Sequence, residues 1–491
     1  MSGKRLTPFV QRWLSNTLKP ETASTQPLCR RQHTLVRKPL CSNSVRIPHR
    51  TFTRSSTLCK AKSTDQQQKA VLQQLELPDF GSDLKFKGLE TDFPCLARTP
   101  ESGPDPAYQK VVSGYQNFHY NEPYSLKYNG CVLPELNIAY ETWGELNHDM
   151  SNVVVVFTGL SSSSHVRSHP LNKAPGWWEK FIGPGCAIDT DKFFVICGNH
   201  IGGCYGTTGP SSTNPITGKA YGTTFPVVSV EDMVKVQYLL LDHLGIDKVH
   251  AVVGASLGGM CSVMAAALYP QRVGRVVSIS ACAQTYASSI ALRFLQRRAI
   301  MTDPNWQRGH YYGTSYPKMG MKLAREIATI TYRSGPEWKQ RFGRKLIDPA
   351  EPPSLCPSFE IEEYIMHQGE TFSNKYDPNS LLYISKAMDM FDMGEGFSSL
   401  QEGMARVQCP VMVLGAQTDI LIPIWQQREI ADLLKASGNE AVSFYELNSI
   451  FGHDTFLLDL TSVGGAIKGQ LETDLKENGL VRKAAPSRLK K

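Results

Sequence analysis

The sequence has no long uninterrupted apolar segment and no closely paired cysteines. A membrane-spanning helix needs about 18 consecutive apolar residues, whereas the apolar run at residues 153–157 ends after five. The twelve cysteines among the 491 residues include no C-x-x-C pair, which argues against a zinc framework and a dense disulfide scaffold. We therefore predict no membrane segment, no metal site, and thiols that serve mostly as small buried apolar groups in a reducing compartment.

Acidic residues are almost absent from residues 1–62. This segment holds thirteen Lys and Arg and a single acid, Glu21, while the rest of the chain carries 39 basic and 44 acidic side chains. The net charge of +7 thus comes from one end, and the remainder lacks the basic excess that nucleic-acid binding requires. The composition is typical of a disordered mitochondrial transit peptide, which predicts location in the mitochondrial matrix. A basic tail that binds an acidic partner is the alternative.

Beyond this segment, the apolar pattern predicts alternating strands and helices. Residues 230–244 have apolar positions at helical spacing and end at Gly245, between two strand-like runs, so they predict a βαβ unit. Short runs rich in β-branched residues are typical of strands buried between helices. The predicted strands cover residues 131–140, 153–157, 193–197, 249–253, 276–280, 411–414 and 442–447.

The stretch between the strands at 276–280 and 411–414 has helical periodicity throughout. The predicted helices cover residues 292–301, 319–332, 337–342, 359–369 and 380–390. We interpret them as a helical lid inserted into an α/β core. The predicted organisation is a loop-rich lead-in with little regular structure at 63–124, core at 125–289, lid at 290–400, core at 401–470, and a basic tail at 471–491.

One serine has the surroundings of a catalytic nucleophile. Ser256 lies between Gly254 and Gly258, after a predicted strand and before a predicted amphipathic helix at 260–268. A nucleophile elbow needs small neighbours in this position, because the serine is held on a sharp turn above the sheet. The motif in this context predicts an α/β-hydrolase fold with a mostly parallel central sheet and a helical lid.

A nucleophilic serine needs a histidine to accept its proton and an acid to orient that histidine. In this fold the acid and then the histidine follow the serine along the chain. Asp419 follows the strand at 411–414 and His453 follows the strand at 442–447, so both are expected where the strands end. The alternatives are a turn carboxylate and a structural histidine.

An oxyanion hole is expected from two backbone N–H groups. In this fold one belongs to the residue after the nucleophile, here Leu257, and the other to the loop after an earlier strand. Gly159 and Leu160 begin that loop, after the strand at 153–157. An ordinary tight turn is the alternative.

Four separated motifs together resemble the homoserine O-acetyltransferase family: 254–260, the sequence NHIGGCYGTTGP at 199–210, 419–423 and 452–454. The resemblance covers residues 125–465 and implies transfer of an acyl group from acyl-CoA to a small amino acid by a ping-pong mechanism. It also implies that no cofactor is permanently bound, and it suggests a homodimer through the lid.

The resemblance assigns the triad to Ser256, Asp419 and His453. It further makes Asp454 a ligand for the ammonium group of the substrate and Arg325 a ligand for its carboxylate. An amino acid presents one charge of each sign, and leaving either unpaired in a buried site is costly. The alternatives are a helix-capping acid for Asp454 and an exposed helix charge for Arg325.

The loop after the first central strand bears on the acceptor. Homoserine enzymes usually have Ala-Leu-Thr there, whereas this chain has Gly159, Leu160, Ser161 and Ser162. Residues 331–338 and 376–390 are more similar to the serine O-succinyltransferase branch, which favours L-serine over L-homoserine. The two acceptors differ by one methylene, which discriminates by only about 1–3 kcal/mol.

The donor is open between succinyl-CoA and acetyl-CoA. A succinyl group needs a cation for its free carboxylate, and Arg293, Arg297 and Arg298 are the available side chains near the lid entrance, with solvated helix charges as the favoured interpretation. A lipase or esterase is the alternative of another class, because it would share the triad. It would have no use for Arg325 or Asp454.

Overall fold

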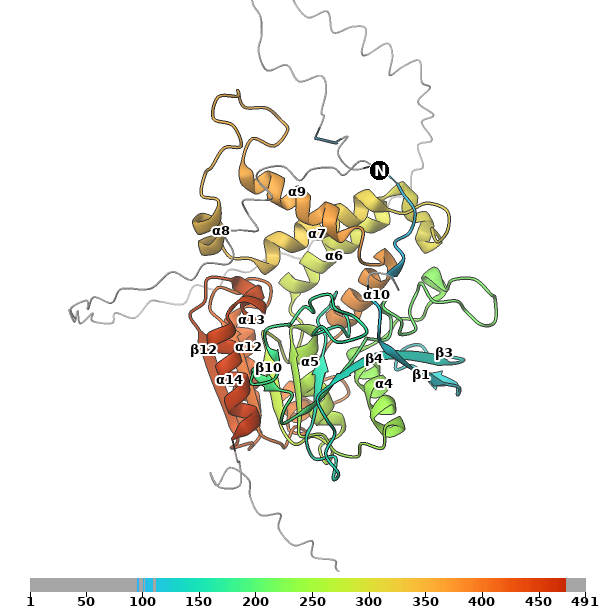
Figure 1. Cartoon of the computed structure of the whole chain (residues 1–491), viewed down its shortest axis with the longest axis vertical. Coiled ribbons are helices and arrows are strands. Elements are labelled where there is room, and N and C mark those ends of the chain that lie inside the picture. The colour runs from blue at the N-terminus through green and yellow to red at the C-terminus, as the bar shows by residue number, and fades with distance from the viewer. Residues whose placement is uncertain (1–94, 97–99, 101, 109–111, 474–491) are drawn as a thin grey trace, which may run out of the picture. The chain divides into compact units, whose positions relative to one another are not determined.

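The structure, a computed structural model, describes residues 95–96, 100, 102–108 and 112–473. The predicted transit peptide, much of the lead-in and nearly all of the basic tail lie outside these residues. The described part is built on an eight-stranded sheet in the order β1-β4-β8-β5-β9-β10-β11-β12 (Figure 1). The strands are β1 (Gln116–Tyr120), β4 (Leu136–Trp143), β8 (Phe194–Gly198), β5 (Val153–Phe157), β9 (Ala251–Ala255), β10 (Val276–Ile279), β11 (Val411–Ala416) and β12 (Val442–Leu447).

The six strands from β8 to β12 run parallel, and β1 and β4 pair antiparallel at one edge. The mostly parallel sheet of the prediction is therefore confirmed. Because parallel strands end at the same edge of the sheet, the loops that follow β5, β9, β11 and β12 are brought together there. This edge carries the residues that the sequence singled out.

Helices cover both faces of the sheet, which explains the continuous apolar runs of the strands. In β5, Val153, Val155 and Phe157 belong to the same apolar cluster as α4 (Val230–His243), α5 (Leu257–Leu268) and α12 (Ile424–Ala436). The intervening Val154 and Val156 pack in the cluster that contains α14 (Leu460–Glu472) and Trp178. Because successive residues of a strand point to opposite faces of the sheet, β5 contributes side chains to two separate apolar cores.

Five of the six α-helices described between β10 and β11 confirm the helices predicted for this stretch, each within a few residues; the sixth is the short α11 (Leu400–Met404). The five are α6 (Ala287–Thr302), α7 (Lys318–Tyr332), α8 (Gly335–Arg341), α9 (Glu360–Phe372) and α10 (Pro378–Asp389). α7 packs against both α6 and α9. In Figure 1 these helices lie beyond the end of the sheet at which the parallel strands terminate, so they face the expected site.

The prediction of little regular structure before residue 124 is wrong at β1. This strand has the sequence QNFHY, with polar residues at both of its faces, and it pairs with β4 over its full length. Phe118 and Tyr120 alternate with polar residues and pack against the main apolar core, but every residue of β1 is exposed or half-buried, so the alternation is short and weak. Its pairing with β4 is what makes this segment a strand, and that pairing is not encoded in the five residues themselves.

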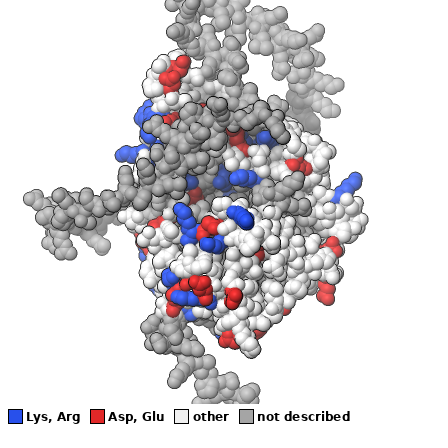
Figure 2. Space-filling model, viewed as in Figure 1, with Lys and Arg blue, Asp and Glu red and all other residues white. Residues whose placement is uncertain are grey.

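Three features of the structure concern the cellular location and the partners of the protein: a disulfide bond, the length of the helices and the distribution of surface charge. Cys95 and Cys356 form a disulfide, which is more typical of an oxidising compartment than of the reducing one predicted. No helix in the described part of the chain is long and apolar enough to cross a membrane. On the face shown in Figure 2, basic and acidic side chains are intermixed.

Candidate active site

The backbone at Ser256 is held in a conformation that side-chain-bearing residues rarely adopt. Its φ is 57° and its ψ is −121°, at the junction of β9 and α5. A Cβ on Gly254 would lie 2.2 Å from the carbonyl oxygen of Gly258, and a Cβ on Gly258 would lie 2.2 Å from that of Phe157. Both glycines are therefore required, because α5 begins directly against the neighbouring strands. The geometry is that of a nucleophile elbow.

His453 and Asp419 meet at the ends of β12 and β11. His453 Nδ1 lies 2.7 Å from Asp419 Oδ2, and both side chains are buried. The other oxygen of Asp419 accepts hydrogen bonds from the backbone N–H groups of Leu421 and Ile422, each at 2.9 Å. These bonds fix the carboxylate, which places a proton on His453 Nδ1 and leaves Nε2 as the basic nitrogen.

The electrostatics of His453 suit a general base. Burial lowers its pKa, but the charge of Asp419 and the hydrogen bond to it outweigh burial, so the pKa is raised above its ordinary value. His453 Nε2 is buried and has no hydrogen-bond partner among the described residues. In the described part of the chain, His453 Nε2 and Ser256 Oγ form no hydrogen bond. Hydrogen bonds between a catalytic base and its nucleophile often reach bonding distance only when substrate binds.

The loop after β5 lies beside the elbow and is held by two side chains. A Cβ on Gly258 would lie 3.1 Å from the oxygen of Thr158, so the start of this loop borders the first turn of α5. His200 Nε2 donates to the Thr158 oxygen at 2.9 Å, and Tyr376 donates its hydroxyl to the Leu160 oxygen at 2.9 Å. Burial lowers the pKa of His200 to about 4, so it stays neutral and its Nδ1 carries no proton.

The predicted oxyanion residues fit this arrangement. Leu257 is the first residue of α5, and the N–H of a first helical residue has no partner within the helix. A Cβ on Gly159 would meet only Ser162 Oγ, at 3.5 Å. The glycine is therefore not demanded by crowding within the chain, and the space beside it is open. Ser161 and Ser162 continue the same loop and are half-buried.

Asp454 and Arg325 lie close enough to influence each other electrostatically. Burial raises the pKa of Asp454, and the charges of Arg333, His453 and Arg325 oppose that rise without cancelling it. Arg325 projects from α7 between the rings of Tyr332 and Phe372, with its guanidinium carbon 4.9 and 4.5 Å from their centres. Its Nε is buried and has no hydrogen-bond partner in the described part of the chain. It is not a solvated helix charge.

Arg333 was not identified from the sequence, although it lies within the lid motif at 331–338. Its Nε lies 3.3 Å from Asp454 Oδ2, and its Nη1 donates to Glu337 at 2.8 Å. Arg333 thus partly neutralises Asp454 and ties the residue after His453 to the lid. The sequence pattern of the lid helices does not indicate this contact. The contact joins the turn between α7 and α8 to the loop after β12, which are distant in the sequence.

Two of the three lid arginines are buried, contrary to the interpretation as solvated charges. Arg293 Nε and Arg297 Nη2 donate to the two oxygens of Asp389, at 2.6 and 2.5 Å. Arg298 is exposed. Two guanidinium groups on one carboxylate leave an excess positive charge, and Arg293 Nη2 is buried without a hydrogen-bond partner among the described residues. The positive charge of Arg293 lowers the pKa of His453. The excess charge of this group is therefore close enough to the triad to act on it.

Comparison with known proteins agrees with this geometry. Residues 152–459 match the alpha/beta hydrolase fold family. The serine O-succinyltransferase of Emericella nidulans is 47% identical, and the match covers 77% of this chain and 87% of that protein. The crystal structure of homoserine O-acetyltransferase from Bacillus anthracis matches with a TM-score of 0.68 and 31% identity, covering 74% of this chain and 98% of that one.

A hydrolase structure is also similar. The crystal structure of esterase E22 matches with a TM-score of 0.67 and 30% identity, and covers 73% of this chain and 100% of that one. The predicted fold and family are both confirmed by these matches. The chain belongs to the α/β-hydrolase fold family, and within it to the acyltransferase family that includes homoserine O-acetyltransferases and serine O-succinyltransferases.

Proposed function

We propose that this enzyme transfers an acyl group, succinyl in preference to acetyl, from acyl-CoA to the hydroxyl of L-serine, a reaction that serves cysteine biosynthesis. The observation that carries the proposal is the pair of opposite charges, Arg325 and Asp454, next to a Ser-His-Asp arrangement. A zwitterionic amino acid matches both charges. The identity to a serine O-succinyltransferase supports the choice of serine.

The first half-reaction acylates Ser256. His453 Nε2 takes the hydroxyl proton as Ser256 Oγ attacks the thioester carbonyl, and the negative oxygen is stabilised by the N–H groups of Leu257 and of the loop at Gly159 and Leu160. The carbon–sulfur bond then breaks, and the CoA thiolate takes the proton from His453. The product is an acyl ester on Ser256 and free CoA.

The second half-reaction transfers the acyl group. The ammonium group of the amino acid binds Asp454 through Oδ1, because Arg333 occupies the side of Oδ2, and its carboxylate binds the free edge of Arg325. His453 then removes the proton of the acceptor hydroxyl, which attacks the ester, and returns it to Ser256 Oγ. Water at the same place would give hydrolysis, so exclusion of water by the lid helices determines the outcome.

The donor choice rests on Arg293. Its unpartnered Nη2 and the excess charge of the Arg293, Arg297 and Asp389 group provide a cation for the free carboxylate of a succinyl group. We predict that Arg293→Met lowers kcat/KM for succinyl-CoA by about 100-fold, the effect of losing a charge-assisted hydrogen bond in a buried site, and leaves acetyl-CoA use within a few-fold.

The exposed Arg298 provides the matched control, because Arg298→Met removes the same charge from the same helix. Initial rates with both donors measure the selectivity. If Arg293→Met lowers kcat/KM for succinyl-CoA and for acetyl-CoA to the same extent, Arg293 stabilises the lid and does not bind the succinyl carboxylate. Arg297 and Asp389 remain a balanced pair in this variant, so the burial of Asp389 is still compensated.

The proposed function is tested by supplying L-serine or L-homoserine with succinyl-CoA or acetyl-CoA and measuring CoA release. The expected result is acceptor-dependent release that is fastest with L-serine and succinyl-CoA. Faster reaction with L-homoserine would assign the protein to the alternative, a homoserine O-acetyltransferase of methionine biosynthesis. Release that no acceptor stimulates would support ester or thioester hydrolysis, the class of activity for which esterase E22 is named.

Two further proposals concern location and assembly. The composition of residues 1–62 supports mitochondrial import. The Cys95–Cys356 disulfide argues against a reducing compartment. A mature protein that still begins near Met1 would contradict import.

A homodimer through the lid is supported by exposed apolar side chains on α6 and α7: Phe294, Leu295, Leu323 and Ile330. A monomeric mass in sedimentation would contradict the dimer.

A further inference from the structure

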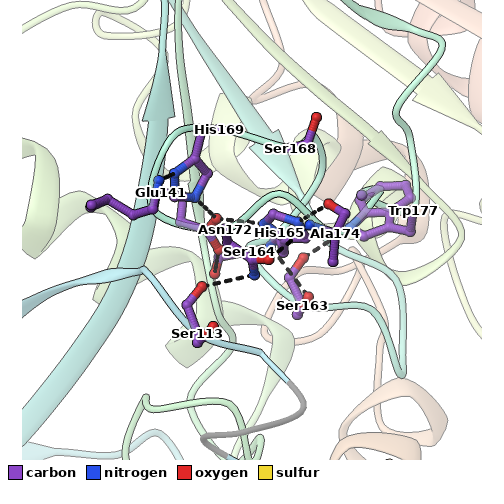
Figure 3. A network of polar contacts seen from close by, with 12 residues as sticks. Ser113, Glu141, Ser163, Ser164, His165, Ser168, His169, Asn172, Ala174 and Trp177 are labelled. Carbon is purple, nitrogen blue, oxygen red and sulfur yellow. Dashed lines mark hydrogen bonds and ion pairs between the residues drawn. The ribbon is translucent and has the colours of Figure 1, made fainter.

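A second cluster of titratable side chains lies beside the loop that follows β5 (Figure 3). Glu141, on β4, is buried, and its Oε2 lies 2.8 Å from His165 Nδ1 and 2.7 Å from His169 Nε2. The three side chains offer ligand atoms within 4.8 Å of one another. Two histidines and a glutamate also form the ligand set of some zinc enzymes, and the proposed mechanism uses none of the three.

The hydrogen-bond partners assign the protons of both histidines. His169 Nδ1 accepts from the backbone N–H of Leu171 at 3.3 Å, so the ring proton lies on Nε2 and points to Glu141. A nitrogen that carries a proton cannot bind a metal. His169 is therefore a neutral donor in this arrangement.

His165 has an acceptor at each ring nitrogen. Its Nε2 lies 2.7 Å from the carbonyl oxygen of Ala174, which can only accept, and its Nδ1 faces the carboxylate of Glu141. Both nitrogens must donate, which makes the ring an imidazolium. Burial lowers the pKa of His165, but the hydrogen bonds to Glu141 and Ala174 and the charges of Glu141 and Glu179 raise it above its ordinary value. Glu141 and His165 thus form a buried ion pair.

This ion pair is connected to the loop at Ser161 and Ser162 through Ser164. Ser164 Oγ donates to Glu141 Oε1 at 2.6 Å, and its backbone N–H donates to Asn199 Oδ1 at 2.7 Å. Asn199 in turn donates to Ser164 Oγ at 2.9 Å. The far end of the loop is therefore held by Glu141 and Asn199, and its near end by two other side chains, those of His200 and Tyr376.

We propose that Glu141 and His165 are positioning residues for the acceptor half of this loop, and that protons, not a metal ion, fill their site. The proposal rests on the proposed function, because it takes Ser161 and Ser162, the part of the loop that differs from the homoserine enzymes, to border the bound amino acid. The oxyanion half of the loop has its own anchors. The ion pair accordingly acts on the second half-reaction and leaves acylation of Ser256 unchanged.

The test separates the two half-reactions in Glu141→Gln, which keeps the shape of the side chain but removes its charge. The expected result is a kcat/KM for the acceptor lowered about 100-fold, the effect of misplacing a binding group by about 1 Å, with the initial burst of CoA release from succinyl-CoA alone within 2-fold of the wild type. Ser164→Ala, which cuts the connection and leaves the ion pair intact, is expected to show the same selective loss.

His250→Gln is the control for disturbing a half-buried histidine that bonds a backbone carbonyl. His250 also bonds a backbone carbonyl, that of Leu471 at 2.8 Å, but it precedes β9 at the opposite edge of the sheet, and its variant should match the wild type in both half-reactions. If Glu141→Gln and Ser164→Ala lower the burst of CoA release as much as they lower kcat/KM for the acceptor, the ion pair of Glu141 and His165 only stabilises the structure and the proposal is wrong. Unchanged kinetics in both would overturn the proposal.

Titration of the full chain with Co²⁺ tests the protonated state directly. We expect no stoichiometric visible absorption that depends on Glu141. A stoichiometric Co²⁺ spectrum in the wild type that disappears in Glu141→Gln would overturn the proton-filled site. The Co²⁺ result does not depend on the proposed function, which is tested separately by comparing L-serine and L-homoserine as acceptors in the wild type.

Discussion

Ser256→Ala is expected to lower kcat by about 10⁵- to 10⁶-fold, the effect of removing a nucleophile from a Ser-His-Asp triad. The residue sits on the turn between β9 and α5, and its neighbours on that turn, Ala255 and Leu257, carry no hydroxyl that could replace its Oγ. The oxyanion donors remain in the variant, and they alone give little turnover. CoA release with L-serine and succinyl-CoA measures the loss.

Ser262→Ala is the matched control for this variant. Ser262 lies on α5, the helix that follows Ser256, is completely buried, and donates its hydroxyl to the carbonyl oxygen of Gly258 at 2.8 Å. Its removal therefore deletes one helical side-chain hydrogen bond, and we expect activity within a few-fold of the wild type. Ser256→Ala with more than a hundredth of normal turnover would remove Ser256 from the mechanism.

Asp419→Asn is expected to lower kcat by about 10⁴-fold. The backbone N–H groups of Leu421 and Ile422 hold one oxygen of Asp419, so the amide of an asparagine must turn its NH₂ group towards His453. His453 Nδ1 then has to accept, which moves the ring proton to Nε2, the position that must be empty to activate Ser256. Initial rates at saturating substrate measure the loss.

The same variant makes a second prediction for pH dependence. His453 must be neutral to act as a base, and Asp419 favours its charged form and so raises its pKa. The acid limb of the wild-type rate profile therefore lies above the ordinary histidine pKa, and Asp419→Asn should move the limb to lower pH. A limb that stays in place would show that another group titrates. Normal activity of the variant would exclude Asp419 from the triad.

The triad was predictable because each member follows a strand that local sequence reveals. β9 and β11, which precede Ser256 and Asp419, are buried on both faces, so their apolar runs are distinct. β12, which precedes His453, is half-buried to exposed but keeps a strand-like sequence, and parallel strands must end at one edge. Ser256 needed Gly254 and Gly258 for steric reasons, which left a recognisable motif. The order of acid and histidine along the chain then followed from the fold.

Contacts between distant segments were beyond prediction. The burial of Arg293 depends on Asp389, 96 residues later, and the connection of Arg333 to Asp454 depends on how the turn before α8 meets the loop after β12. Nothing in the helical spacing of α6 distinguishes the buried Arg293 from the exposed Arg298. The protonation of His165 likewise follows from the carbonyl of Ala174, a backbone atom that no side-chain pattern encodes.

The central claim is that Ser256 carries the acyl group between CoA and a small amino acid, and the intact mass of the enzyme tests it most directly. Mixing the enzyme with succinyl-CoA alone is predicted to add the mass of one succinyl group, located on Ser256 by peptide mapping and absent from Ser256→Ala. Addition of L-serine is predicted to remove that mass and release O-succinylserine. Acyl transfer without any covalent intermediate, or an adduct that L-serine does not discharge, would contradict the account.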